Sequence, residues 1–212
     1  MTKMLSYLLF ALALAACGEP DRPSISLYLA LQRGDIDQIE RHIHWGTDIN
    51  EFDPDGRRPL HVAAATGRVV VVKLLLKHGA EVNALDKENR TALERAVLAG
   101  RTQIADLLLS QGARLEPSTL LLDAAHAGAR DRDIVRWLVD HGADLEARST
   151  DGDTPLLIAV RDNNHRLARH LIDQGADVNV RDAGGTSALE LARALGHEEI
   201  AHWLRRSGAA DP

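Results

Sequence analysis

The fold of this chain is decided by residues 152–160, which read Gly-Asp-Thr-Pro-Leu-Leu-Ile-Ala-Val. Thr154 predicts a helix N-cap, because its hydroxyl can accept a hydrogen bond from the first turn, and Pro155 suits that turn because its missing N–H is not needed there. Asn163 stands where a left-handed residue would end this short apolar helix. A second helix with an apolar stripe follows and ends at Gly175. The stretch therefore predicts two short helices joined by a tight turn.

The same unit recurs along most of the chain. Gly-Ala pairs begin at residues 79, 112, 142, 175 and 208, and Gly46-Thr47 precedes them. Successive pairs are 33 residues apart, except for an interval of 30 between residues 112 and 142. A fixed period of this length is typical of a solenoid, in which each unit buries its apolar faces against its neighbours.

The other units keep the same start and stop signals. Thr91 and Ser187 are each followed three residues later by a glutamate, which predicts capping boxes, whereas Arg58 precedes Pro59 without a capping hydroxyl. At the position of Asn163 the other units carry Gly67, Gly100, Gly128 and Gly196.

Two motifs give a family resemblance. Residues 58–64 read Arg-Pro-Leu-His-Val-Ala-Ala and residues 79–83 read Gly-Ala-Glu-Val-Asn, while Thr-Pro-Leu returns at 154–156 and Gly-Ala-Asp-Val-Asn at 175–179. These units resemble ankyrin repeats, whose signature is T-P-L-H-x-A near the start and G-A-D-V-N near the end. The resemblance implies an all-α repeat solenoid of ankyrin-type helix-turn-helix units with short β-hairpin loops.

The resemblance covers residues 26–210, in which six units are expected: 26–52, 53–85, 86–116, 117–148, 149–181 and 182–210. The fourth unit departs from the pattern. Nine residues separate Gly112 from Leu121, whereas the other units take 14 to the matching leucine. The hairpin before this unit, with Pro117 in it, is therefore expected to lack five residues and a projecting finger. The turn between its helices is expected to be two residues longer.

The N-terminal segment differs in composition from the repeats. Lys3 precedes an almost continuous apolar run over residues 5–16, which is too short to span a bilayer and predicts a signal peptide over residues 1–16. Residues 14–18, Leu-Ala-Ala-Cys-Gly, resemble a bacterial lipobox, which implies lipidation of Cys17. An ordinary signal peptide that leaves an incidental Cys17 is the alternative.

The lipobox resemblance also implies a location. Gly18, rather than aspartate, follows the cysteine, which by the proteobacterial sorting pattern implies an outer-membrane lipoprotein facing the periplasm; a soluble periplasmic protein is the alternative. Residues 17–25 then read as the lipidated cysteine and a polar tether. Because Cys17 is the single cysteine of the chain, no disulfide can form within it.

Composition and charge exclude some classes of partner. The 212 residues are 45% hydrophobic and 26% charged, as in a globular protein, with a net charge of −6. A nucleic-acid-binding protein is usually basic, so no nucleic acid is expected.

The ten histidines raise the question of a metal site. His197 and His202 enclose two glutamates as in a zinc-protease motif, but that motif needs histidines at i and i+4 on one helical face, and these stand at i and i+5. No nucleophile motif or phosphate-binding glycine loop is present. We therefore expect no metal, no cofactor, no small-molecule substrate and no enzymatic activity.

Five further side chains have expected places. Asp153, Asp162 and Asp177 occupy repeat positions that are expected to be exposed to solvent. Trp137 and Trp203 occupy one repeat position on second helices and are expected to pack between helices.

The ankyrin resemblance implies a protein-binding surface formed by the fingers and the groove. The expected contact residues are Asp55, Arg57, Lys87, Glu88, Arg90, Arg148, Thr150, Asp151, Asp153, Arg161, Asp162 and Arg181. The expected function is that of a monomeric scaffold, or of an inhibitor or immunity protein, in the cell envelope. Two alternatives are an accessory factor for a periplasmic antioxidant enzyme and a structural envelope lipoprotein without a specific soluble partner.

Overall fold

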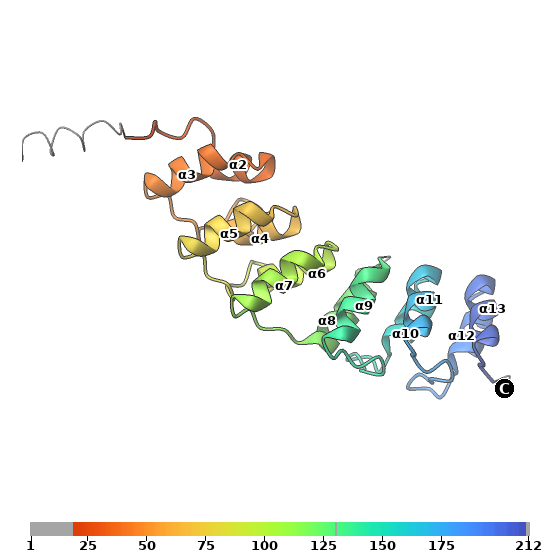
Figure 1. Cartoon of the computed structure of the whole chain (residues 1–212). Helices are drawn as coiled ribbons and strands as arrows, with labels where there is room; N and C mark the ends of the chain where they lie inside the picture. Colours follow the sequence, from red (N-terminus) through yellow and green to blue (C-terminus); the bar gives the residue numbers. More distant parts are fainter. Residues whose placement is uncertain (1–18, 130, 211–212) are drawn as a thin grey trace, which may run out of the picture.

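A computed structural model describes residues 19–129 and 131–210. These residues form six helix pairs that stack side by side into an elongated array, with the first pair and the carboxyl terminus at opposite ends (Figure 1). The pairs are α2 (Leu27–Arg33) with α3 (Ile36–His44), α4 (Pro59–Ala65) with α5 (Val69–Lys77), α6 (Ala92–Leu98) with α7 (Thr102–Ser110), α8 (Pro117–His126) with α9 (Arg132–Asp140), α10 (Pro155–Arg161) with α11 (His165–Asp173), and α12 (Ala188–Ala194) with α13 (Glu198–Arg206). The predicted all-α repeat solenoid is confirmed.

The loops between pairs contain no strand among the described residues. They are tight turns, and the pairing between Arg181 and Ser187 is an isolated bridge. The expected hairpins are therefore present as turns rather than as β-structure.

The predicted capping signals are confirmed. Thr91 and Ser187 form complete capping boxes with the glutamates three residues later, and Thr154 accepts a hydrogen bond from the N–H of Leu157. Arg58 makes no side-chain cap. Asn163 adopts a positive φ of 52° in the turn between α10 and α11, which is the left-handed conformation expected of it.

An alanine at the same position of every first helix is fully buried. These are Ala30, Ala63, Ala96, Ala124, Ala159 and Ala192, each with 0% exposure. Each lies four residues before the turn glycine or asparagine, and its carbonyl accepts the N–H that follows this turn, as in the 2.8 Å bond from Arg101 to Ala96. A methyl side chain suits close packing between neighbouring first helices, which is most extensive between α4 and α6.

Polar side chains join successive units beside the carboxyl ends of the second helices. Asn83 donates to the carbonyl of Gly112 and accepts from the N–H of Arg114. Asn50 makes the same two bonds one unit earlier. Ser118 accepts the corresponding bond from the N–H of Asp144. A hydrogen-bonded seam therefore accompanies the apolar core.

The fourth unit is built as its sequence predicts, with one difference. Residues 111–116 connect α7 to α8 without the turn that forms a finger elsewhere. Five residues, 127–131, separate α8 from α9, whereas three residues, 66–68, separate α4 from α5. Pro117 was expected within the hairpin but lies in the first turn of α8, where its missing N–H is tolerated. Pro117 thus begins the helix early, and α8 has ten residues where α6 has seven.

Trp137 packs between helices as expected. Its side chain is buried, and its Nε1–H donates to Asp106 of the preceding unit at 2.7 Å. Trp203 is half-buried, with the guanidinium groups of Arg169 and Arg206 at 4.6 and 5.3 Å from its ring centroid.

The buried alanine predicts a sharp difference between Ala96, within α6, and Ala99, the residue that caps its carboxyl end. Ala96→Leu adds volume to a contact without space, and we expect it to lower the free energy of unfolding by about 1–3 kcal/mol. The control Ala99→Leu makes the same change at an exposed position and should stay within about 0.5 kcal/mol of the parent. Urea unfolding measures both. Equal effects would show that the close approach of the first helices is not limiting.

Candidate protein-binding surface

Four turns project between successive pairs, and we call these residues, 52–58, 85–91, 148–154 and 181–187, the fingers. A side chain at the start of each finger holds its backbone. Asp53 accepts from the N–H of Arg57, Asp86 from those of Glu88 and Arg90, and Asp182 from those of Gly184 and Thr186. In the third finger, Ser149 accepts from the N–H of Asp153. Each finger is thus a closed, hydrogen-bonded turn.

Arginines neutralise the acids of the first two fingers. Arg57 lies 2.8 Å from Asp53 and 2.6 Å from Asp55. Arg95, on α6, lies 2.6 Å from Asp86 and 3.0 Å from Glu88. The predicted contact residues Asp55, Arg57 and Glu88 are therefore already paired within the protein.

The prediction that Asp153 is exposed is wrong. Asp153 is 8% exposed, because its carboxylate points inward and accepts hydrogen bonds from Arg161 at 2.6 and 3.3 Å. Arg161 also binds Asp182 of the next finger at 3.0 Å. Asp153 and Arg161 therefore link two fingers, while Asp162 and Asp177 are exposed as expected.

Arg148 and Arg181 also bind within the protein. Arg148 donates to the carbonyls of Gly152 and Arg181, at 2.6 and 3.2 Å. Arg181 donates to the carbonyl of Gly185 at 2.8 Å and lies 3.4 Å from Glu190. Both guanidinium groups fasten the last two fingers, although their side chains remain exposed.

Four of the predicted contact residues are exposed at the surface. Lys87, Thr150, Asp151 and Asp162 are exposed, and none forms an ion pair with another described residue. Lys87 and Glu88 flank one side of the absent finger, and Thr150 and Asp151 lie on the other.

Two apolar side chains were not found by the sequence reasoning. Phe52 is 40% exposed and Leu85 45% exposed, and they occupy the same position in the first two fingers. The Arg58 guanidinium lies 4.4 Å from the Phe52 ring centroid and donates to the carbonyl of Leu85, so Arg58 bridges these two residues, which together we call the finger patch. The Lys87 ammonium lies 5.7 Å from the same ring. Their place in the repeat could have identified them in the sequence, because Arg148 and Arg181 occupy the same position in the last two fingers and were predicted to contact a partner.

Arg90 spans the place of the absent finger. Its guanidinium lies 3.7 Å from Asp123 on α8, and its carbonyl accepts a hydrogen bond from Nε2 of the buried His61 at 2.9 Å. At the opposite edge of the same junction, a groove of about 360 Å³ lies between residues 98–100 and 127–134. The deletion therefore changes both edges of the stack.

The fingers shift the pKa values of their acids. Burial disfavours the charged form of Asp86, but the N–H groups of Arg90 and Glu88 and the guanidinium of Arg95 outweigh it, so the pKa lies below its usual range. The N–H groups of Thr186 and Gly184, with Arg161, lower the pKa of Asp182. These carboxylates are charged at neutral pH and act as structural acceptors.

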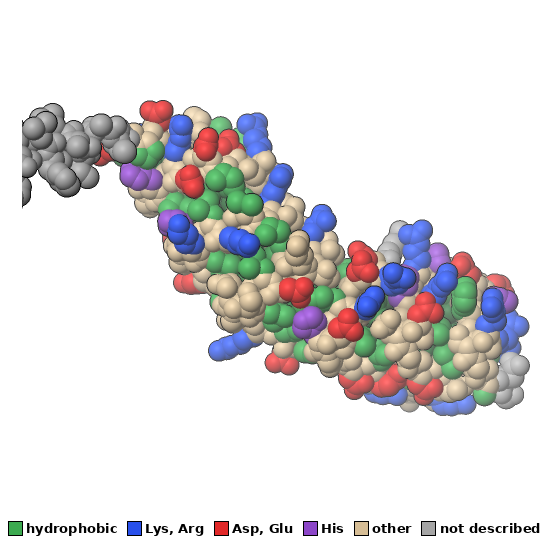
Figure 2. All heavy atoms as spheres, in the orientation of Figure 1, with side chains coloured by type: hydrophobic (Ala, Val, Ile, Leu, Met, Phe, Trp, Pro, Cys, Tyr) green, Lys and Arg blue, Asp and Glu red, His purple; other side chains and the backbone are tan. Residues whose placement is uncertain are grey.

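The surface has no large area of one charge on the face that Figure 2 shows. Lys and Arg side chains alternate there with Asp and Glu, and hydrophobic side chains lie between them (Figure 2). Across residues 19–129 and 131–210, no group of three His, Cys, Asp or Glu residues is placed to hold a metal ion. Over the same residues every helix is too short or too polar to cross a membrane.

A protein-family model described as ankyrin repeats in three copies matches residues 27–119 and again residues 121–212. The chain belongs to the ankyrin-repeat family. Ankyrin repeats mediate protein–protein interaction, and this fold is generally a non-catalytic module. No curated protein shows significant similarity to the chain.

Several solved structures are similar to this chain. The ankyrin-repeat domain of Bcl-3, a member of the IkappaB protein family, is 27% identical with a TM-score of 0.69, over 90% of this chain and 89% of that one. A chain from the Bdellovibrio bacteriovorus predatory endopeptidase in complex with an immunity protein is 25% identical with a TM-score of 0.67, over 87% and 99%. An ankyrin-repeat domain from Acinetobacter baumannii is 29% identical with a TM-score of 0.64, over 87% and 98%.

The lowered pKa of Asp86 predicts how stability depends on pH. A carboxyl whose folded pKa is depressed contributes stability above its unfolded pKa of about 3.9, and this contribution is lost as the pH falls through the folded value. We expect Asp86→Asn to lower the free energy of unfolding by about 1.5–3 kcal/mol at neutral pH. The difference from the parent should shrink as the pH falls below about 4. Asp151→Asn, at an exposed and unpaired carboxylate, is the control. A difference that does not change between neutral and acidic pH would contradict the assignment.

Proposed function

We propose that this protein is a non-catalytic protein-binding module of the bacterial cell envelope, attached through Cys17 and facing the periplasm. It binds one protein partner along the fingers and acts as a scaffold or as an inhibitor of the immunity type. The observation that supports this most is the small patch of Phe52 and Leu85, which lies in the first two fingers beside the uncompensated charge of Lys87.

The finger surface suits a specific partner for a physical reason. Most of its charges are paired within the protein, so a partner does not need to remove water from many isolated ions. Exposed apolar side chains next to a few unpaired charges provide burial together with orientation. The hydrogen-bonded turns hold these groups in place before binding, which lowers the entropic cost of association.

Support for an inhibitor comes from the similarity to a chain of the endopeptidase–immunity protein complex, which extends over 87% of this chain. Support for a location in the cell envelope comes from the sequence alone, through the apolar run over residues 5–16 and the lipobox-like residues 14–18. These residues lie outside the part of the chain that the structure describes.

The finger patch predicts the outcome of a capture experiment. Phe52→Ala with Leu85→Ala should reduce capture of the partner from envelope extract by about tenfold or more, because each buried apolar side chain contributes about 1–2 kcal/mol. Val70→Ala, which removes an exposed aliphatic side chain from α5, is the control and should leave capture unchanged. Equal stability of the three proteins is checked by thermal unfolding.

Two outcomes would contradict the finger interface. Equal capture by the double variant and the parent would place the partner elsewhere on the stack. The absence of any stoichiometric protein partner would favour the structural-lipoprotein alternative.

The anchor is tested separately with Cys17→Ser. A stable membrane anchor needs more than one acyl chain, each contributing about 0.8 kcal/mol per buried methylene, and a lipidated, acylated cysteine provides this. We expect the variant to move from the membrane pellet to the soluble fraction when envelope fractions are compared by immunoblot. Unchanged fractionation would show that Cys17 is not the anchor.

A further inference from the structure

The segment that precedes α2 is held against the helix stack by hydrogen bonds. The sequence predicts a polar tether over residues 17–25, of which Cys17 and Gly18 lie outside the described residues. Residues 20–25, which we call the strap, lie along α3. The N–H of Ser24 donates to Oε1 of Gln38 at 2.8 Å, and Nε2 of His42 lies 2.7 Å from the carbonyl oxygen of Ile25.

His42 fastens the carboxyl end of the strap. A carbonyl oxygen can only accept, so Nε2 carries the hydrogen and donates it to Ile25. Nδ1 of the same ring lies 3.0 Å from the hydroxyl of Thr47, which fixes the ring from its other side. Ile25 itself packs against the core.

Trp45 fastens the amino end of the strap. Its Nε1–H donates to the carbonyl of Pro20 at 3.1 Å, and the guanidinium of Arg22 lies 5.0 Å from its ring centroid. Asp21 adds an ion pair with Arg41 at 3.7 Å. Gln38 and His42 are four residues apart on α3, and Arg41 and the C-cap residue Trp45 have the same spacing, so all four side chains lie near one face of the helix. The strap therefore runs antiparallel to α3 and has its amino end beside Trp45.

We infer that the strap holds the first helix pair against the membrane surface, with Trp45 and Arg22 at the level of the lipid headgroups. This inference rests on the anchoring of Cys17 in the proposed function. The solenoid then stands at the membrane on its α2–α3 end, and the finger row extends away from the bilayer at a fixed orientation.

The length of chain between the anchor and the strap sets this geometry. Cys17 precedes Pro20 by three residues, which span at most about 11 Å when extended. A free tether from Cys17 to Ser26 would span up to about 30 Å at the same rise per residue. The headgroup layer of one leaflet is about 5–8 Å thick. With the strap docked, Trp45 lies within reach of this layer, where tryptophan is enriched in membrane proteins.

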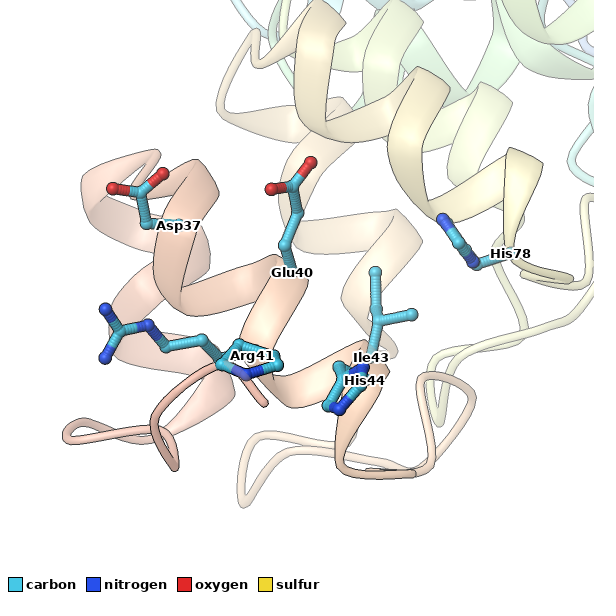
Figure 3. Close-up of a pocket in the computed structure, with 7 residues that line it drawn as sticks. Asp37, Glu40, Arg41, Ile43, His44 and His78 are labelled. Carbon is cyan, nitrogen blue, oxygen red and sulfur yellow. The ribbon is translucent and has the colours of Figure 1, made fainter. Parts of the chain in front are cut away.

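A neighbouring pocket limits the proposed membrane contact to the carboxyl end of α3. The pocket, of about 520 Å³, lies between α3 and the end of α5, and its lining includes Asp37, Glu40, Arg41, His44 and His78 together with Pro20 of the strap (Figure 3). The carboxylates of Asp37 and Glu40 are repelled by anionic headgroups, so their part of the pocket stays in water, whereas Pro20 and Arg41 lie at the edge that the strap shares. Trp45, which is 40% exposed, and Arg22 do not line the pocket and face the bilayer.

The test uses the full protein purified from membranes and reconstituted into vesicles of phosphatidylethanolamine and phosphatidylglycerol with brominated acyl chains. Bromine quenches tryptophan emission only at close range. We expect part of the emission to be lost, and this loss to disappear in Trp45→Phe but to persist in Trp203→Phe, because Trp203 lies at the opposite end of the stack. Insertion of about eight Gly and Ser residues between Gly18 and Glu19 leaves the strap docked but frees the anchor, and should reduce the loss severalfold.

Each outcome has a distinct meaning. The acyl chains on Cys17 are measured by mass spectrometry on the same preparation. Cys17 without acyl chains would overturn the anchoring and the orientation together. An acylated protein whose quenching is unchanged in Trp45→Phe, or unaffected by the inserted linker, would overturn the orientation alone.

Discussion

The close approach of the first helices is the interaction on which the rest of this structure depends. Helices of seven to ten residues are not stable alone in water, so each pair persists only by burying its apolar faces against its neighbours. Ala30, Ala63, Ala96, Ala124, Ala159 and Ala192 are fully buried at the same place in all six pairs. The repeated spacing of the sequence is the consequence of this repeated burial.

A regular stack fixes the finger row. The N–H of Lys87 donates to the carbonyl of Gly56 at 2.9 Å, and this joins the first two fingers. Gly56 has a φ of 80°, and a Cβ at this position would meet the Lys87 side chain at 2.4 Å. Only glycine therefore allows this approach. Arg148 and Arg161 join the last two fingers, so each half of the row is rigid before a partner binds.

The fourth unit shows how the stack tolerates a deletion. Ala124 is as buried as its counterparts, but α8 contacts α6 less closely than the other first helices contact their neighbours, and the hydrogen-bonded seam is carried by Ser118. The finger is absent, and the ion pair between Arg90 and Asp123 occupies the junction. The deletion therefore keeps the alanine buried, weakens the contact between α6 and α8, and alters the surface that a partner meets.

The sequence by itself determined the repeat, the caps, the turn conformation of Asn163 and the missing finger, because each depends on local spacing and on single-residue chemistry. The tertiary structure decided which charges remain available to a partner. Asp153 was expected at the surface, but Arg161, eight residues away, draws its carboxylate inward. Glu88 was expected to meet a partner, but Arg95 of the next helix binds it. The docking of residues 20–25 also required the structure, because Gln38, His42 and Trp45 form one line only once α3 is folded. Contacts between side chains that are distant in sequence depend on the packing of helices, and no local pattern encodes them.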